Sequence, residues 1–329
     1  MALERFLKCA SLAIAVSGAV SAAPSYQVVD LTPVVKPEAR PTSIAKNFVA
    51  GNTFNVGPWV YELGAPGATW IPIPSNQFAA VTAVNEDGAA VGWIDTSAGR
   101  RAFLFADGVF SILPVPGGYV QATAIDASGR IAGHADSKAF IYDDGAITNL
   151  GTFGGRFSIP RGIDRSAGVV GYSELANGAI HAFVYGDGQL RDLGTLGTDL
   201  VSFSFGFGIN HQGLVVGYSS RYGFPPTRAV LFDENGPHDL GLLPGYFGAR
   251  AFAINKKGDI VGEAEQSART RAIVVTDGAM WDLNDVAPSP FNLVDAIGIT
   301  DEGVIAGTAN PNGNANTFGA TAFIALRKD

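Results

Sequence analysis

Apolar and polar residues alternate in short segments along nearly the whole chain after about residue 26. Between residues 120 and 152, for example, four segments read VQATAID, GRIAGHAD, KAFIYDD and AITNLGT, with Asn, Asp and Gly at their ends. Alternation with a period of two predicts half-buried strands, and the polar residues between them predict tight turns. No stretch after residue 22 keeps a helical period. The pattern therefore predicts an all-β chain of short strands.

A ten-residue module recurs along the chain and sets the repeat length. Copies such as AVNEDGAAVG (83–92), AIDASGRIAG (124–133) and AINKKGDIVG (253–262) combine two apolar segments with a turn and end in glycine. The seven closing glycines are Gly51, Gly92, Gly133, Gly171, Gly217, Gly262 and Gly307. They are 41, 41, 38, 46, 45 and 45 residues apart, which is the period of propeller blades or solenoid units.

A second module follows each closing glycine. The segments KAFIYDDGAITNLGTFGG (138–155) and HAFVYGDGQLRDLGTLGT (181–198) align without a gap, RAFLFADGVFSILPVPGG (101–118) aligns with them, and two looser copies start at residues 228 and 271. The HAF tripeptide at His181–Phe183, the DLGTLG segment that follows it and the AIN..G.IVG modules resemble the HAF-repeat family of bacterial extracellular proteins over about residues 26–329. The resemblance implies export and a repeat fold, and it implies no catalytic residues.

The two ends of the repeat region complement each other. The last repeat ends with TAFIALRKD (321–329), after its third strand, whereas SYQVVDLTP (25–33) has the pattern of a fourth strand. We predict a seven-bladed β-propeller of four-stranded blades, closed by the N-terminal strand, because closure protects the sheet edges. An open β-solenoid is the alternative, and it would leave both ends incomplete.

The N-terminal segment has the pattern of a secretory signal. Arg5 and Lys8 precede an apolar run over residues 9–20, and the small residues of AVSAAPS follow. We predict a signal peptide over residues 1–22, a propeller over 23–329 and a secreted or periplasmic location. No later segment is long and apolar enough to span a membrane. Cys9 is the only cysteine, so the mature chain would have neither thiol nor disulfide.

Composition narrows the classes of partner. Loss of the signal removes two cations and one acid, which changes the net charge from −8 to −9 and argues against binding to nucleic acid. No spacing matches a zinc site, a phosphate-binding loop or a nucleophile elbow, and the DDG and GDG turns lack the acids of a calcium loop. We therefore expect no cofactor and no metal.

Antiparallel blades predict two different faces. The first–second and third–fourth turns lie on one face, here named the tight-turn face, and their lengths are uniform. The second–third loops and the links between blades lie on the other, here named the variable-loop face, and their lengths differ from blade to blade. Variable loops on a rigid scaffold are where recognition usually occurs.

Arginine and aromatic residues collect on the variable-loop face, and acidic residues collect on the tight-turn face. A basic residue or histidine precedes the alanine of the second module in five repeats, and we interpret this position as structural. These residues are Arg101, Lys138, His181, Arg228 and Arg271. The candidate ligand-binding residues on this face are Trp93, Tyr119, His134, Arg156, Arg161, Arg221, Tyr222, Tyr246, Arg250 and Glu263. For most of them, a structural role is as well supported as a role in binding. We expect His134 to be an exposed polar residue rather than a base.

These observations favour an exported, monomeric, non-catalytic binding protein that recognises a glycan or a cell-envelope protein on its variable-loop face. A carbohydrate-active hydrolase or lyase is the first alternative, because acids from several blades can meet at the axis of a propeller. The acids in question are Asp136, Glu174, Glu263 and Glu265. A purely structural envelope protein is the second alternative.

Overall fold

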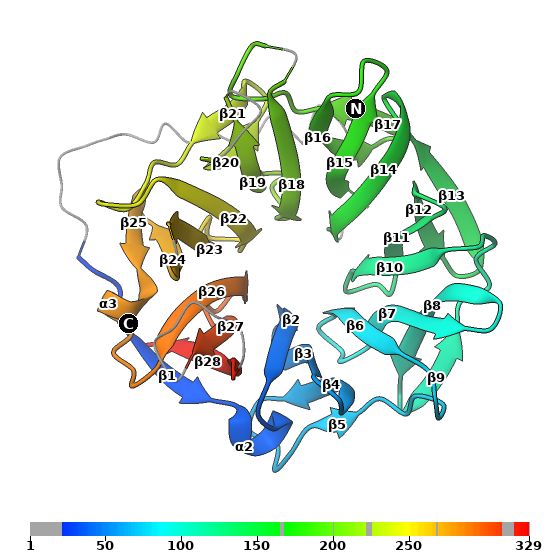
Figure 1. Cartoon of the computed structure of the whole chain (residues 1–329), viewed down its shortest axis with the longest axis horizontal. Coiled ribbons are helices and arrows are strands. Elements are labelled where there is room, and N and C mark those ends of the chain that lie inside the picture. Colours follow the sequence, from blue (N-terminus) through cyan, green and yellow to red (C-terminus); the bar gives the residue numbers. More distant parts are fainter. Residues whose placement is uncertain are drawn as a thin grey trace.

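The computed structural model describes residues 22–164, 168–199, 201–221, 226–267, 269–310 and 319–328. These residues form seven four-stranded antiparallel sheets around a central axis, and each sheet is one blade (Figure 1). The fold is the predicted all-β, seven-bladed β-propeller. The predicted signal peptide falls almost entirely on residues 1–21, which lie outside the described residues.

The strands of each blade run in chain order from the axis to the rim, except in blade 7. Blades 1 and 2 consist of β2 (Ala39–Ala45), β3 (Phe48–Thr53), β4 (Gly57–Glu62), β5 (Thr69–Trp70), β6 (Ala79–Val84), β7 (Ala90–Thr96), β8 (Gly99–Ala106) and β9 (Val109–Ile112). Blades 3 and 4 consist of β10 (Val120–Ile125), β11 (Ile131–Ala135), β12 (Lys138–Asp143), β13 (Ala146–Gly151), β14 (Gly154–Ile163), β15 (Val169–Leu175), β16 (Ile180–Gly186) and β17 (Gln189–Asp192). Blades 5 and 6 consist of β18 (Phe203–Ile209), β19 (Val215–Ser220), β20 (Arg228–Asp233), β21 (Gly236–Asp239), β22 (Gly248–Ile254), β23 (Ile260–Gln266), β24 (Arg269–Thr276) and β25 (Ala279–Asp282).

Blade 7 joins the two ends of the ring. It contains β26 (Asn292–Ile299), β27 (Ile305–Asn310), β28 (Thr321–Arg327) and, as its outermost strand, β1 (Tyr26–Asp30). The register of the last pair runs from Tyr26 opposite Arg327 to Asp30 opposite Phe323. The predicted closure by the N-terminal strand is therefore confirmed, and the open solenoid is excluded.

The hydrophobic core lies between the blades rather than within a single layer. Seven buried clusters occur among the described residues, and each joins two neighbouring blades around the ring. The aromatic residue of the third strand packs on the closing glycine of the second: a Cβ on Gly133 would lie 2.7 Å from Phe140 Cζ and 2.3 Å from the carbonyl oxygen of Gln121. The glycine recurs because a main-chain carbonyl of the innermost strand lies too close for a Cβ in every blade, and in blade 3 an aromatic ring also occupies the space.

Side-chain amides in the tight turns connect neighbouring blades. Asn255 Oδ1 accepts the N–H groups of Lys257 (3.0 Å) and Asp259 (2.9 Å), and its Nδ2 donates to the carbonyl of Thr300 in blade 7 (3.2 Å). Asn85 repeats this arrangement between blades 2 and 3. The turn motif of the repeat therefore stabilises both the hairpin and the ring.

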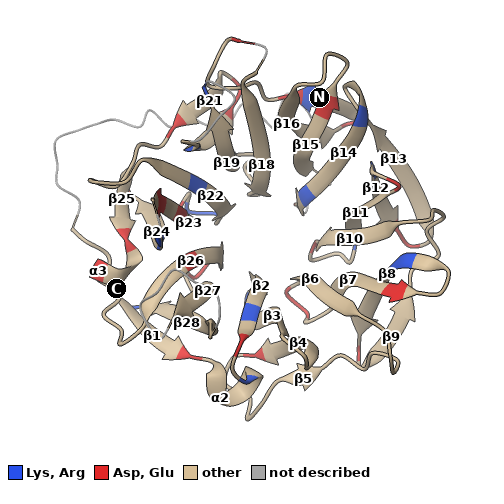
Figure 2. Cartoon of the chain, viewed as in Figure 1, with Lys and Arg blue, Asp and Glu red and all other residues tan. Residues whose placement is uncertain are grey.

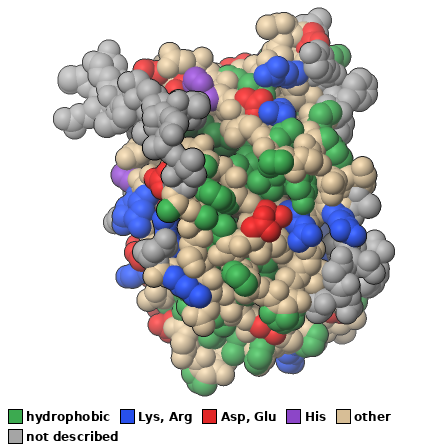
Figure 3. All heavy atoms as spheres, turned by 90° about the vertical axis from the view of Figure 1, so that its left-hand side faces the viewer, with side chains coloured by type: hydrophobic (Ala, Val, Ile, Leu, Met, Phe, Trp, Pro, Cys, Tyr) green, Lys and Arg blue, Asp and Glu red, His purple; other side chains and the backbone are tan. Residues whose placement is uncertain are grey.

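Two one-turn helices interrupt the strands, α2 (Thr32–Val35) and α3 (Leu283–Val286). The sequence pattern predicted no helix, because a single turn is too short to show a period. The side chain of Asp282 caps α3 by accepting the N–H of Asn284. Among the described helices, none has the length and apolar character needed to cross a membrane. On the part of the rim that Figure 3 shows, acidic, basic and hydrophobic side chains are interspersed.

Candidate functional site

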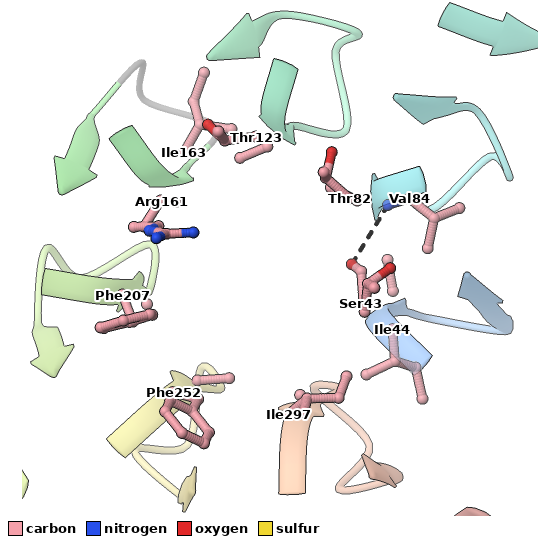
Figure 4. Close-up of a pocket in the computed structure, with 18 of the residues that line it drawn as sticks. Ser43, Ile44, Thr82, Val84, Thr123, Arg161, Ile163, Phe207, Phe252 and Ile297 are labelled. Carbon is pink, nitrogen blue, oxygen red and sulfur yellow. Dashed lines mark hydrogen bonds between the residues drawn. The ribbon is translucent and has the colours of Figure 1, made fainter. Parts of the chain in front are cut away.

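The innermost strand of every blade carries a β-bulge opposite the closing glycine. In β14, for example, the register with β15 shifts between Pro160 and Gly162, which leaves Arg161 as the extra residue. The same shift occurs at the equivalent place in the other six innermost strands. The seven bulged residues are Thr42, Thr82, Thr123, Arg161, Phe207, Phe252 and Ile297. A bulge redirects a side chain, and here all seven residues line one axial cavity of about 270 Å³ (Figure 4).

A ring of branched aliphatic residues, here named the aliphatic collar, lines the same cavity two positions further along each innermost strand. It consists of Ile44, Val84, Ile125, Ile163, Ile209, Ile254 and Ile299. Five of these residues also line a second cavity of about 210 Å³, which the residues of the tight turns surround. The collar therefore separates the axial cavity from the tight-turn face, and the axial cavity belongs to the variable-loop side.

The wall of the axial cavity differs from blade to blade. Blades 1 to 3 contribute threonines, and the hydroxyl of Thr82 donates to the main-chain carbonyls of Val91 (3.0 Å) and Ala122 (2.9 Å). Blade 4 contributes Arg161, whereas blades 5 and 6 contribute phenylalanines. Because the Thr82 hydroxyl is hydrogen-bonded to main-chain carbonyls, it is less available to a ligand. The charged and aromatic side chains of the wall lie on blades 4 to 6.

Arg161 is exposed and points into this cavity (Figure 4). Its guanidinium carbon lies 5.6 Å from the ring centre of Tyr172 and 5.5 Å from that of Phe207, within the range of cation–π attraction. Nη2 donates to the Tyr172 hydroxyl at 3.4 Å. No ion pair within 4.0 Å joins Arg161 to a carboxylate of the described part of the chain.

Half-buried rings continue from Arg161 across blades 4 to 6, and two of them, Phe207 and Phe252, line the cavity. Tyr172 lies 4.5 Å from Phe205, which lies 4.9 Å from Tyr218, and Phe207 lies 5.6 Å from Tyr218 and 5.7 Å from Phe252, measured between ring centres. We name these five residues the axial aromatic cluster. They come from blades 4, 5 and 6, so three neighbouring blades build a continuous aromatic surface at the axis.

A charged group adjoins this cluster on blade 6. Arg250 binds Glu263 (3.0 Å) and Glu265 (2.5 Å), and its guanidinium lies 5.3 Å from the ring centre of Tyr218. Burial raises the pKa of Glu263 to about 7, against the opposing charge of Arg250, and the charge of Asp295 adds to the increase. Burial also raises the pKa of Asp295, which accepts the N–H of Thr308.

A separate group of predicted residues occupies blades 2 and 3. Arg100 lies 3.6 Å from the ring centre of Trp93 and 4.8 Å from that of Tyr119, and it makes two bonds to Asp95 (2.7 and 2.9 Å). The expectation that His134 is exposed is wrong: it is 7% exposed, because its ring stacks on Tyr119. Burial lowers the pKa of His134 to about 4, so the ring is neutral at neutral pH.

The other predicted binding residues lie apart from the axis or outside the described residues. Arg156 pairs with Glu174 (2.6 Å) and lowers the pKa of that carboxyl to about 2, and Arg221 lies 3.6 Å from Asp239. Tyr246 packs against the core between blades 5 and 6. Tyr222 lies outside the described residues.

The acids of the enzyme alternative do not all meet. Asp136 accepts the main-chain N–H groups of Gly118 and Tyr119, and Glu174 is bound by Arg156. Only Glu263 and Glu265 share a partner. Among the described residues, no group of three or more His, Cys, Asp or Glu side chains is arranged to hold a metal ion.

The recurrent cations make contacts that agree with a structural role. Lys138 Nζ donates to the carbonyl of Arg156 in the next blade (2.6 Å), and Arg101 donates to the carbonyl of Gly117 in the link to blade 3 (2.9 Å). His181 bonds Asp192 within its own blade (2.8 Å).

Sequence reasoning found Arg161, Arg250 and Glu263 but missed the aromatic residues and Asp295. A signal for part of this site was present, because the bulged residue lies ten positions before the closing glycine in six of the seven repeats. That column contains Thr82, Thr123, Arg161, Phe207, Phe252 and Ile297. It was not recognised because a bulge cannot be located from alternation alone.

The sequence matches no protein-family model and no curated relative. Several solved propellers have a similar structure. An oligogalacturonate lyase from Vibrio parahaemolyticus has a TM-score of 0.58 at 10% identity, over 91% of this chain and 93% of that one. YCF48 bound to D1 peptide has a TM-score of 0.55 at 12% identity, over 94% and 100%. The β-propeller domain of the Trilobed protease from Pyrococcus furiosus has a TM-score of 0.52 at 11% identity, over 94% and 96%. These likenesses show the propeller fold alone.

Proposed function

We propose that this chain is a non-catalytic binding protein that holds a glycan, or a glycan-bearing envelope partner, over the variable-loop mouth of its axial cavity. The observation that carries the proposal is the axial aromatic cluster, of which Phe207 and Phe252 line the same cavity as Arg161. Aromatic faces beside a cation are typical of sites that bind sugars and other ligands with both apolar and polar surfaces. We also propose that the chain is exported, monomeric and a member of the HAF-repeat group, and that it binds no nucleic acid.

Calorimetric titration with defined oligosaccharides tests the binding site. The panel consists of chitotetraose, cellotetraose and tetragalacturonate, and the site variant is Phe207→Ala with Phe252→Ala. Loss of affinity in this variant supports the proposal. Phe78→Ala is the control, because Phe78 is a more exposed aromatic (80%) on the same face but lines a different groove, between blades 1 and 2. Affinity lost in the control alone, or no binding by the native chain, would contradict the proposal.

One observation favours the carbohydrate-active alternative. Glu263 and Asp295 are half-buried carboxyls on blades 6 and 7 whose charges interact, and the pKa of Glu263 at about 7 suits a general acid at neutral pH. Such an enzyme would release new reducing ends or unsaturated products from the same oligosaccharides. Turnover by the native chain that Glu263→Gln abolishes would replace the binding proposal.

A further inference from the structure

We propose that the axial site selects a ligand with a carboxylate on a sugar-sized ring, such as the end residue of an acidic glycan, and that Arg161 binds this carboxylate. The inference rests on the proposed function, because it names the ligand class of the same site. It stands on the position and contacts of Arg161, on the charges around it, and on the shape of the cavity wall.

Arg161 differs from the other arginines near the axis. Figure 2 shows basic residues on the innermost strands β2, β14 and β22, which carry Arg40, Arg161 and Arg250. Arg250 binds two carboxylates, and the charge of Arg40 interacts with Asp295, where it partly offsets the increase in pKa that burial causes. A guanidinium has five N–H donors. Among the described residues, Arg161 directs one bond at 3.4 Å to a tyrosine hydroxyl and has no carboxylate partner.

The nearby acids are already engaged by other groups. Glu174, on the same blade, accepts three bonds from the Arg156 side chain and one from its main-chain N–H. Glu263 and Glu265 are bound by Arg250. The positive charge of Arg161 therefore extends into its surroundings, where it contributes to the lowered pKa of His134. An anion that neutralises it would come from a ligand.

The cavity wall favours an organic anion over a bare inorganic one. Phe207 presents its ring beside Arg161, Phe252 follows next to Phe207, and Ile297 continues this apolar side on blade 7. The innermost strands pair on one side only, so their other edge faces the axis and offers main-chain N–H and C=O groups for hydroxyls. A bidentate guanidinium, an apolar ring face and scattered main-chain polar groups match the carboxylate, C–H face and hydroxyls of an acidic sugar.

The size of the cavity limits how much of the ligand enters. At about 270 Å³ it is slightly smaller than most small-molecule sites, and the aliphatic collar lines its inner end. One ring fits this space better than a folded peptide. The rest of an acidic glycan would then lie outward on the axial aromatic cluster.

The test compares matched probes by calorimetry: D-glucuronate, its neutral methyl ester, D-glucose and inorganic phosphate. We expect glucuronate to bind on the order of tenfold more tightly than either neutral sugar, because the neutral forms leave the guanidinium unpaired. Arg161→Gln should remove this preference, and Arg161→Lys should restore only part of it, since lysine cannot bind in a bidentate manner. Arg191→Gln, on the outermost strand of the same blade, is the matched control and should keep it.

The outcomes separate the inference from the proposed function. Equal affinity for glucuronate and glucose, or a preference for glucuronate that remains in Arg161→Gln, overturns the inference. In that case, binding of a neutral sugar that is lost in the Phe207→Ala, Phe252→Ala variant still supports the proposed function. Tighter binding of phosphate than of glucuronate also overturns it, because the apolar wall would then be unused. No binding of any sugar by the native chain overturns both.

Discussion

The tight-turn face and the variable-loop face lie at opposite ends of the same strands, but their polar side chains differ in how fully they are hydrogen-bonded or paired within the protein. In the tight turns, Asn85 and Asn255 each satisfy main-chain groups in their own hairpin and in the next blade. On the variable-loop side, Arg161 is exposed without a described carboxylate partner, and Glu263 is half-buried with a raised pKa. Satisfied, repeated groups stabilise the ring, whereas groups that stability alone does not explain indicate binding.

The largest effect should follow from a change in the repeated scaffold. Phe103 is completely buried and packs on the closing glycine of its blade. We expect Phe103→Ala to lower the free energy of unfolding by about 3–5 kcal/mol, measured by urea denaturation, because it removes a large side chain from the core. A loss below about 1 kcal/mol would show that the aromatic–glycine contact does not support the blade.

A pH-dependent effect should distinguish Glu263 from the scaffold acids. The ordinary pKa of 4.5 is raised to about 7 in the folded chain, so the folded state keeps a proton that the unfolded state releases. Stability therefore falls as the pH rises between these two values. Glu263→Gln cannot ionise, so its stability relative to the native chain should rise by up to about 3 kcal/mol between pH 4 and pH 8. A pH-independent difference would refute the raised pKa.

A smaller effect is expected at the tight turns. Asn255→Ala leaves the N–H groups of Lys257 and Asp259 and the carbonyl of Thr300 without their side-chain partner. We expect a loss of about 2 kcal/mol in unfolding free energy, with unchanged affinity for any ligand of the axial site. If the variant is fully folded under the conditions of the binding measurement and still binds ligand more weakly, the two faces are not independent.

The smallest effect on stability should come from Arg161. Arg161→Gln removes a cation that is exposed and makes one long hydrogen bond, so we expect its unfolding free energy to stay within about 0.5 kcal/mol of the native value. A destabilisation as large as that of Asn255→Ala would identify Arg161 as a scaffold residue and remove the contrast between the faces.

Much of the fold could be predicted from the sequence because each blade repeats the same pattern of short strands and turns. The closing glycines, a turn residue such as Asn85 or Asn255, and a large apolar residue of the third strand such as Phe140 each recur at one place in the repeat, and the structure gives these examples specific contacts. The candidate site was only partly readable. Arg161 and Arg250 were noticed because they depart from the repeat, whereas His134 was wrongly expected to be exposed, since nothing local shows that Tyr119 covers its ring.

The sequence by itself determined the strands, the seven blades and the closure by β1, because alternation, turn chemistry and period act over neighbouring residues. Only the tertiary structure decided which side chains meet at the axis. A bulge turns one residue of each innermost strand toward the centre, and ring closure brings together Arg161, Phe207 and Phe252 from three different blades. That encounter depends on how whole blades pack around the ring, which no local pattern records.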